Sequence, residues 1–115
     1  MTLRVLLADD EAGIRTVLRL HLQRRGWEVL TVPDGEQALA AARSGGYDVL
    51  VLDQRMPGLT GLEVARALAT EAPVIIYSAY LDDDLHRQAR ELGCHTSTKT
   101  DITALLDRIE QLTTT

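Results

Sequence analysis

The chain has a single cysteine, no long apolar stretch and no excess of positive charge. Because Cys94 stands alone, an internal disulfide is excluded, and a reducing compartment is favoured. A membrane-spanning helix needs about twenty consecutive apolar residues, and no stretch approaches that length. The net charge of −5 makes nucleic acid and anionic membranes poor direct partners. Met1 leads straight into an apolar strand pattern, so we expect no signal peptide and a cytoplasmic location.

Lysine is also nearly absent. Lys99 is the only one, and the other eleven basic residues are arginines. Lysine supplies a compact ammonium on a flexible stem, whereas arginine supplies a planar fork. The presence of a single lysine, Lys99, therefore suggests a site that needs one mobile point charge.

At 115 residues the chain is expected to form one domain, 1–115, in which 113–115 could begin a tail. Short apolar runs alternate with helical patterns along its whole length. The expected strands cover 3–8, 27–32, 47–53, 74–78 and 94–98. The expected helices cover about 11–25, 34–45, 61–70, 82–93 and 101–112. Such alternation predicts parallel pairing through right-handed crossovers, and hence an α/β fold with three layers.

Polar side chains follow the expected strands at the point where each strand ends. Asp9 and Asp10 follow the first strand, Asp53 ends the third, Ser78 ends the fourth, and Lys99 follows the fifth. The carboxyl ends of parallel strands meet at one edge of a sheet, where open α/β sheets bind ligands. Three carboxylates, a hydroxyl and an ammonium at one edge suit a divalent cation and a phosphoryl group.

The pattern resembles the receiver domain of bacterial response regulators over the whole chain. The segment from Asp53 to Gly61, DQRMPGLTG, matches the D-x-x-M-P-x-x-x-G loop of that family. The pair Ser78-Ala79 matches its Thr/Ser-Ala pair, and Lys99 matches its lysine. The resemblance implies a flavodoxin-like (βα)5 sandwich whose five-stranded parallel sheet has the order 2-1-3-4-5.

The resemblance also implies a role for each residue at the strand ends. Asp53 would be the nucleophile that takes a phosphoryl group from a phosphohistidine. Mg²⁺ would be bound by Asp10, Asp53 and the backbone carbonyl of Arg55, with Asp9 acting through a water or orienting the others. Lys99 would pair with Asp53 at rest and with a phosphoryl oxygen later, and Ser78 would hydrogen-bond another phosphoryl oxygen.

The partners implied are those of a signalling relay rather than of a metabolic enzyme. A sensor histidine kinase or a phosphotransfer protein would donate the phosphoryl group. An output domain or protein would read the face built from the fourth helix, fifth strand and fifth helix, and a homodimer could form on phosphorylation. No direct contact with nucleic acid or membrane is expected.

Two positions depart from the family pattern. Thr100 follows Lys99 where a proline is common, and Thr96 stands where the family tends to place Tyr or Phe. We therefore expect activation to rearrange mainly residues 79–84, with Tyr80 as the aromatic that moves. Arg55 and Tyr80 occupy positions that tune hydrolysis of the phosphoryl group in the family.

Three other functions compete with this interpretation. A pseudo-receiver, which binds partners without being phosphorylated, is disfavoured by the intact acidic set. An aspartate-nucleophile phosphatase would carry D-x-D-x-T, whereas Gln54-Arg55 follow Asp53. A flavin carrier would need a phosphate-binding loop after the first strand, where Asp9-Asp10-Glu11 would repel phosphate.

Overall fold

A computed structural model describes residues 2–68 and 71–114. Five parallel strands form one sheet in the order β2-β1-β3-β4-β5, as expected. The strands are β1 (Arg4–Ala8), β2 (Glu28–Val32), β3 (Val49–Asp53), β4 (Val74–Ser78) and β5 (His95–Thr98). The helices are α1 (Ala12–Arg24), α2 (Gly35–Ser44), α3 (Gly61–Ala67), α4 (Asp83–Glu91) and α5 (Ile102–Thr113).

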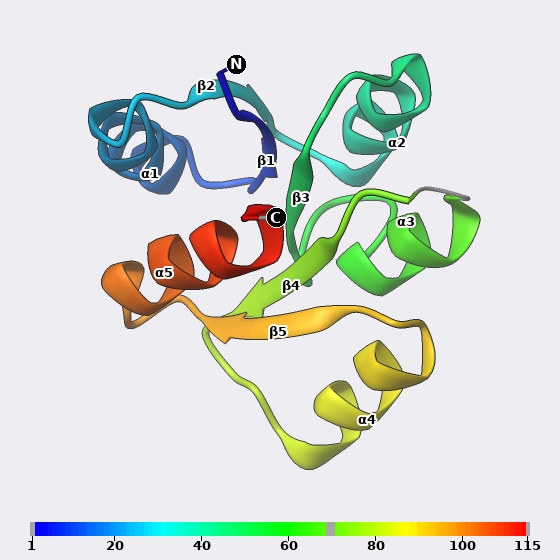
Figure 1. Cartoon of the computed structure of the whole chain (residues 1–115). Coiled ribbons are helices and arrows are strands. Elements are labelled where there is room, and N and C mark those ends of the chain that lie inside the picture. The colour runs from blue at the N-terminus through cyan, green and yellow to red at the C-terminus, as the bar shows by residue number, and fades with distance from the viewer. Residues whose placement is uncertain (1, 69–70, 115) are drawn as a thin grey trace.

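The sheet divides the core in two because successive side chains on a strand point to opposite faces. On β3, Leu50 and Leu52 pack against α2, α3 and α4, whereas Val49 and Val51 pack against α1 and α5. Figure 1 shows the resulting three layers, with α1 and α5 together on one side of the sheet. Both faces of β3 and β4 are covered, which explains why these strands consist mainly of aliphatic residues.

Side-chain caps start most of the helices where the sequence predicts them. Asp34 accepts a hydrogen bond from Gln37 N at the start of α2, and Asp82 accepts one from Leu85 N at the start of α4. The first helix is different: its N-cap is Glu11, which makes no side-chain cap. Asp10 therefore does not cap this helix.

Three helix ends differ from the sequence prediction. The fourth helix was expected to reach residue 93 but ends at Glu91. The third helix was expected to reach Thr70 but ends at Ala67, because Leu68 adopts an extended backbone with φ −92° and ψ 135°. The expected end itself, Thr70, lies outside the described residues. The fifth helix includes Thr113, so the start of the expected tail is still helical.

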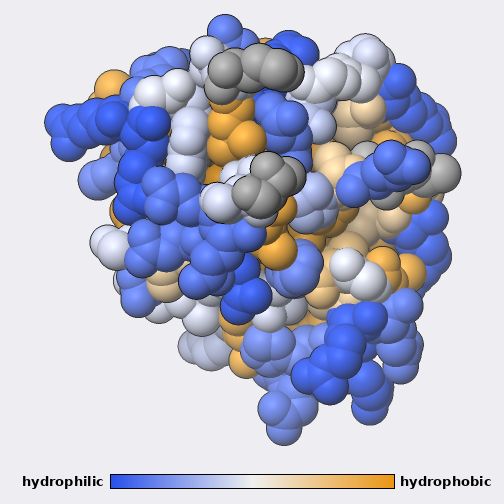
Figure 2. Space-filling model, in the orientation of Figure 1, coloured by the Kyte–Doolittle hydropathy of each residue, from blue (hydrophilic) through white to orange (hydrophobic). Residues whose placement is uncertain are grey.

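The outer surface is largely polar. Figure 2 shows hydrophilic residues gathered over α4, with apolar residues visible mainly between the elements. Within the described residues, no helix is both long enough and apolar enough to cross a bilayer.

Candidate functional site

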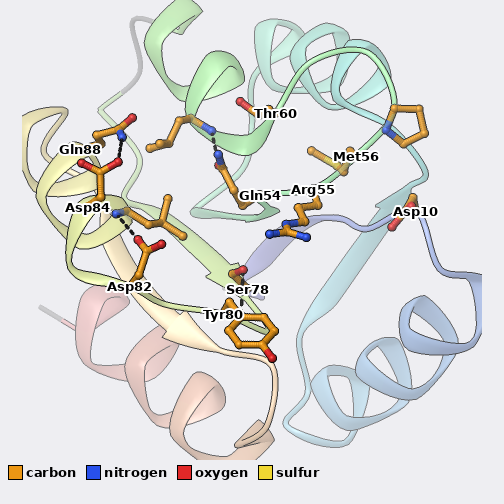
Figure 3. A pocket seen from close by; sticks show the side chains of 13 residues that line it. Asp10, Gln54, Arg55, Met56, Thr60, Ser78, Tyr80, Asp82, Asp84 and Gln88 are labelled. Carbon is orange, nitrogen blue, oxygen red and sulfur yellow. Dashed lines mark hydrogen bonds between the residues drawn. The ribbon is translucent and has the colours of Figure 1, made fainter.

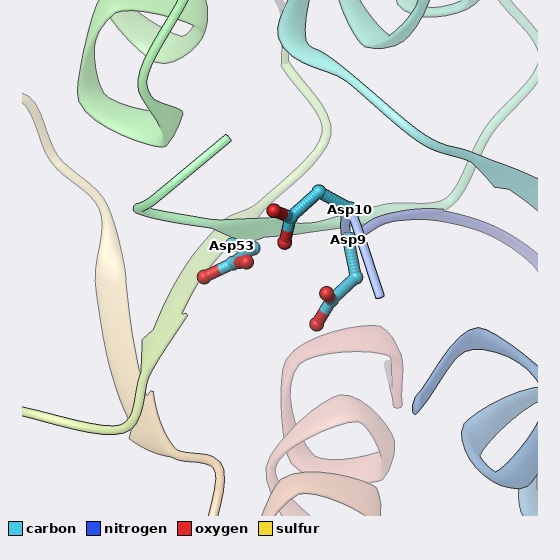
Figure 4. Close-up of side chains that lie close together, drawn as sticks. All are labelled: Asp9, Asp10 and Asp53. Carbon is cyan, nitrogen blue, oxygen red and sulfur yellow. The ribbon is translucent and has the colours of Figure 1, made fainter. Parts of the chain in front are cut away.

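Three carboxylates meet at the carboxyl ends of β1 and β3. Asp9 and Asp10 follow β1, and Asp53 is the last residue of β3. One oxygen from each lies within 4.8 Å of the others. In Figure 4 the Asp10 carboxylate is turned toward Asp53, and the Asp9 carboxylate lies on the side of α5. The order of the strands thus brings together the acidic residues that the sequence predicted to converge.

The three carboxylates differ in burial, and burial changes the electrostatics of Asp53. Asp9 is fully buried and Asp53 is only 2% exposed, whereas Asp10 is exposed. Burial raises the pKa of Asp53 from its ordinary 3.8 to about 6, and the negative charge of Asp9 adds to this rise. Lys99 and the Arg55 amide act in the opposite direction. The Lys99 ammonium therefore offsets only part of the cost of burying the charged Asp53 carboxylate.

Lys99 supplies that ammonium from the turn after β5. Its Nζ lies 3.0 Å from Oδ2 of Asp53 and 3.0 Å from Oδ2 of Asp9. Its backbone N–H donates to the carbonyl of Ser78 at 3.0 Å, which fixes the turn to the end of β4. Burial alone would lower the pKa of Lys99, but the close contacts with the negative charges of Asp53 and Asp9 outweigh it and raise that pKa. The side chain is therefore held in its charged form.

The loop after β3 makes close contacts with both the backbone and the carboxylate of Asp53. Arg55 N donates to Asp53 Oδ1 at 3.2 Å, and the Gln54 side chain accepts from Leu62 N at 3.0 Å. Gly61 packs so closely that a Cβ there would lie 2.7 Å from the carbonyl oxygen of Asp53. The glycine that ends the motif is thus explained by a close approach of the backbone.

Ser78 lies at the end of β4 beside this group. Its hydroxyl oxygen accepts from the N–H of Tyr80 at 3.2 Å. Together with Asp10, Asp53, Arg55 and Lys99 it lines a small cavity of about 180 Å³. The candidate site residues predicted from the sequence therefore surround one space, except that Asp9 is buried beneath it.

A larger depression of about 660 Å³ adjoins the small cavity and extends toward α4. Figure 3 shows Asp10, Arg55 and Ser78 at one end of it and Asp84 and Gln88 of α4 at the other. Tyr80 borders both spaces and is 77% exposed. The loop after β4 therefore has room to move.

The sequence did not reveal Tyr77 as part of the site. Its side chain is buried among the residues that pack on α1 and α5, and its hydroxyl donates to Oδ2 of Asp9. Burial and the hydrogen bond to Asp9 raise the pKa of Tyr77 far above its usual range, so the hydroxyl remains a donor. The available signal was a tyrosine inside an otherwise aliphatic strand, one residue before Ser78.

The structure shows the local surroundings of the two residues that depart from the family pattern. Among the described residues there is no cis peptide bond, so Thr100 follows Lys99 through an ordinary trans bond. Thr96 Oγ1 lies 2.8 Å from Nδ1 of His86. His86 lies on α4, so this contact joins that helix to β5.

The donors at this site fit Mg²⁺. All the available side-chain ligands among Asp9, Asp10 and Asp53 are carboxylate oxygens, which this hard cation prefers. Asp53 Oδ2 is buried, and within the described part of the chain no hydrogen bond of ordinary geometry reaches it, although Lys99 is close. A buried oxygen of this kind is well placed to accept a cation.

Comparison with known proteins agrees with this geometry. The family model described as the response regulator receiver domain matches residues 5–110. Among curated proteins, the transcriptional regulatory protein KdpE of Mycobacterium tuberculosis is 41% identical over 95 residues, which is 81% of this chain and 42% of KdpE. The chain spans less than half the length of the curated relatives it matches.

Solved structures give the same result. The chemotaxis protein CheY4 of Vibrio cholerae superimposes with a TM-score of 0.90 at 27% identity, covering 97% of this chain and 99% of that one. The response regulator protein TrrA from Thermotoga maritima, solved in complex with Mg²⁺-BeF, has a TM-score of 0.85 at 33% identity, covering 96% and 99%. The sequence match, the sheet order and the acidic edge agree, and the chain belongs to the response regulator receiver domain family.

Proposed function

We propose that this chain is the phosphoacceptor of a two-component phosphorelay and that Asp53 receives the phosphoryl group. The observation that carries the proposal is the set of contacts around Asp53. Its carboxylate is buried at a strand end, has the Lys99 ammonium 3.0 Å from Oδ2, and borders a cavity shared with Asp10 and Ser78. Phosphoryl transfer asks a protein mainly for in-line positioning and charge neutralisation, and these groups supply both.

In the proposed step, a carboxylate oxygen of Asp53 attacks the phosphorus of a phosphohistidine. The new bond joins oxygen to phosphorus, and the bond from phosphorus to the imidazole nitrogen breaks. The electron pair stays on that nitrogen, which then takes up a proton. Lys99 would follow the transferred group with its ammonium, and the Ser78 hydroxyl would donate to a second phosphoryl oxygen.

Mg²⁺ is the proposed cofactor, and the oxygen-only donor set supports it. Asp10, Asp53 and the backbone carbonyl of Arg55 would hold the ion. Asp9 would act indirectly, because it is buried and already engaged with Tyr77 and Lys99. When bound, the ion neutralises the negative charge gathered by the carboxylates and the phosphoryl oxygens.

The proposed partners follow from membership of the receiver family. A histidine kinase or phosphotransfer protein would donate the phosphoryl group, in a cytoplasmic setting. The face built from α4, β5 and α5 would contact an output domain or protein, and phosphorylation could favour a homodimer through that face. The chain spans less than half of the transcriptional regulatory proteins that it matches, and we expect an output activity in the part that it does not span.

Intact-mass measurement after incubation with acetyl phosphate tests the proposal. We expect one phosphoryl group per chain, uptake that depends on Mg²⁺, and no uptake by Asp53→Asn. Asp48→Asn is the matched control, since Asp48 lies in the same segment but contacts Arg4 N outside the site. If Asp53→Asn were phosphorylated as the wild type is, the assignment would be wrong. If the wild type took up no phosphoryl group while remaining folded, the chain would be a pseudo-receiver that acts by binding alone.

A further inference from the structure

Tyr77 interrupts an otherwise aliphatic strand beside the site. It is 1% exposed and pairs in register with Asp53 across β3 and β4. Residues paired across parallel strands point to the same face, so both side chains lie on the side covered by α1 and α5. From there the Tyr77 side chain extends to β1, where its hydroxyl donates to Asp9 Oδ2.

Asp9 is held by donors from this chain on both of its oxygens. Oδ1 accepts from the N–H of Glu11 at 2.9 Å, and Oδ2 faces the Tyr77 hydroxyl and Lys99 Nζ. A carboxylate with no exposed surface requires such donors, because its burial without them would be costly. Tyr77 is thus one of only two side-chain donors at Asp9 among the described residues.

Tyr77 also contacts the second of these donors. Lys99 Nζ lies 5.1 Å from the centroid of the Tyr77 ring, within the range of a cation–π interaction. The same ammonium is 3.0 Å from both Asp9 and Asp53. Without the hydroxyl, Asp9 Oδ2 would depend on Lys99 alone and would draw the ammonium away from Asp53.

We propose that Tyr77 is a positioning residue of the phosphoacceptor site, whose hydroxyl satisfies Asp9 so that Lys99 stays shared with Asp53 and Asp9 does not compete as a direct cation ligand. This inference rests on the proposed function and deepens it. Tyr77 touches neither the phosphoryl group nor the cation in this scheme. In this scheme Asp9 and Asp53 together hold Lys99, while Asp10 and Asp53 hold the cation.

The test compares Tyr77→Phe with the wild type in two separate measurements. The dissociation constant for Mg²⁺ is measured by calorimetry, and the phosphorylation rate is measured with acetyl phosphate at saturating Mg²⁺. We expect Mg²⁺ to bind roughly three- to tenfold more tightly, since Asp9 loses a competing donor, and phosphorylation to slow about tenfold, since Lys99 shifts toward Asp9. Tyr47→Phe removes a hydroxyl outside the site and should change neither value.

The two measurements are expected to change in opposite directions, with tighter Mg²⁺ binding and slower phosphorylation. This distinguishes a positioning role from general damage to the site, which would weaken both. If both values were unchanged, or if Mg²⁺ binding weakened in step with the rate, the inference would be overturned. A second comparison uses Asp9→Asn: there, Tyr77→Phe should have no further effect on Mg²⁺ affinity, and a full additive effect would contradict the inference.

The proposed function and this inference can fail independently. A folded wild type that takes up no phosphoryl group would refute the proposed function. The Mg²⁺ affinities of the wild type and Tyr77→Phe would still decide whether Tyr77 restrains Asp9.

Discussion

Thr96 Oγ1 and His86 Nδ1 lie 2.8 Å apart and join β5 to α4. Thr96 stands where receiver domains tend to carry a tyrosine or phenylalanine. At this position the chain therefore has a small hydroxyl bonded to the neighbouring helix instead of a large ring. The loop after β4 is held differently, by the hydrogen bond from Tyr80 N–H to Ser78 Oγ. A movement of Ser78 toward a phosphoryl oxygen would therefore displace this loop directly, without any rotation of an aromatic side chain on β5.

Activation should accordingly rearrange residues 79–84 more than β5. We expect the largest backbone amide shifts there and at the start of α4 when Mg²⁺ and beryllofluoride are added, with small shifts at residues 95–98. Thr96→Val, which breaks the bond to His86, should enlarge the shifts on β5. Large shifts confined to α1 and α2, with residues 79–84 unmoved, would show that the signal leaves this domain by another route.

The lifetime of the phosphorylated state should depend on Arg55 and Tyr80. Both side chains are exposed and line the small cavity that also contains Asp53. Two large side chains able to donate hydrogen bonds can obstruct the in-line approach of water. Replacing both with alanine should shorten the half-life of the phosphorylated chain severalfold, as followed by loss of hydroxylamine-labile phosphate. An equal or longer half-life would remove these residues from control of hydrolysis.

Replacing Lys99 with arginine should impair phosphorylation even though the charge is kept. The ammonium fits between two carboxylate oxygens, 3.0 Å from each, and a wider planar guanidinium cannot take the same place. Because Mg²⁺ is assigned to other residues, its dissociation constant should change little, while phosphorylation slows about tenfold or more. Arg90→Lys, on α4, is the control. A Lys99→Arg chain with the rate of the wild type would exclude Lys99 from the mechanism.

The stability of the metal-free protein should depend on pH through Asp53. Its pKa rises from 3.8 to about 6 on folding, so between these values the folded state binds more protons than the unfolded state. Stability therefore falls as the pH rises through this window, and the penalty is complete above about pH 6, approaching about 3 kcal/mol as an upper limit. Asp53→Asn removes the penalty.

Urea unfolding without Mg²⁺ measures this difference. Asp53→Asn should be more stable than the wild type at pH 7.5, and the advantage should disappear as the pH approaches about 4. An advantage that is constant with pH, or that grows in acid, would contradict the raised pKa.

The sequence predicted those parts of the fold and site that depend on strand ends. Apolar runs located the strands, and parallel pairing then required Asp9, Asp53, Ser78 and Lys99 to meet at one edge. Their convergence needed no knowledge of side-chain conformation. The end of α3 was missed because Leu68 continues the helical pattern of the sequence but adopts an extended backbone.

Contacts across several strands could not be predicted in this way. From the sequence Tyr77 is one more buried residue of β4. Its contact with Asp9 depends on the register of the strands and on a side chain long enough to reach from β4 to the end of β1, with β3 between them. The bond between Thr96 and His86 likewise depends on how α4 packs against β5. Strand periodicity gives the face on which a side chain lies, but not its partner.

The position of the phosphoryl group tests the central claim most directly. After phosphorylation with acetyl phosphate and Mg²⁺, borohydride reduction converts an aspartyl phosphate to homoserine, and tryptic cleavage releases peptide 44–55. Fragmentation of that peptide distinguishes Asp53 from Asp48. We predict homoserine at position 53 alone. Homoserine at position 48, 9 or 10, or none in a chain that has gained phosphate, would contradict the account.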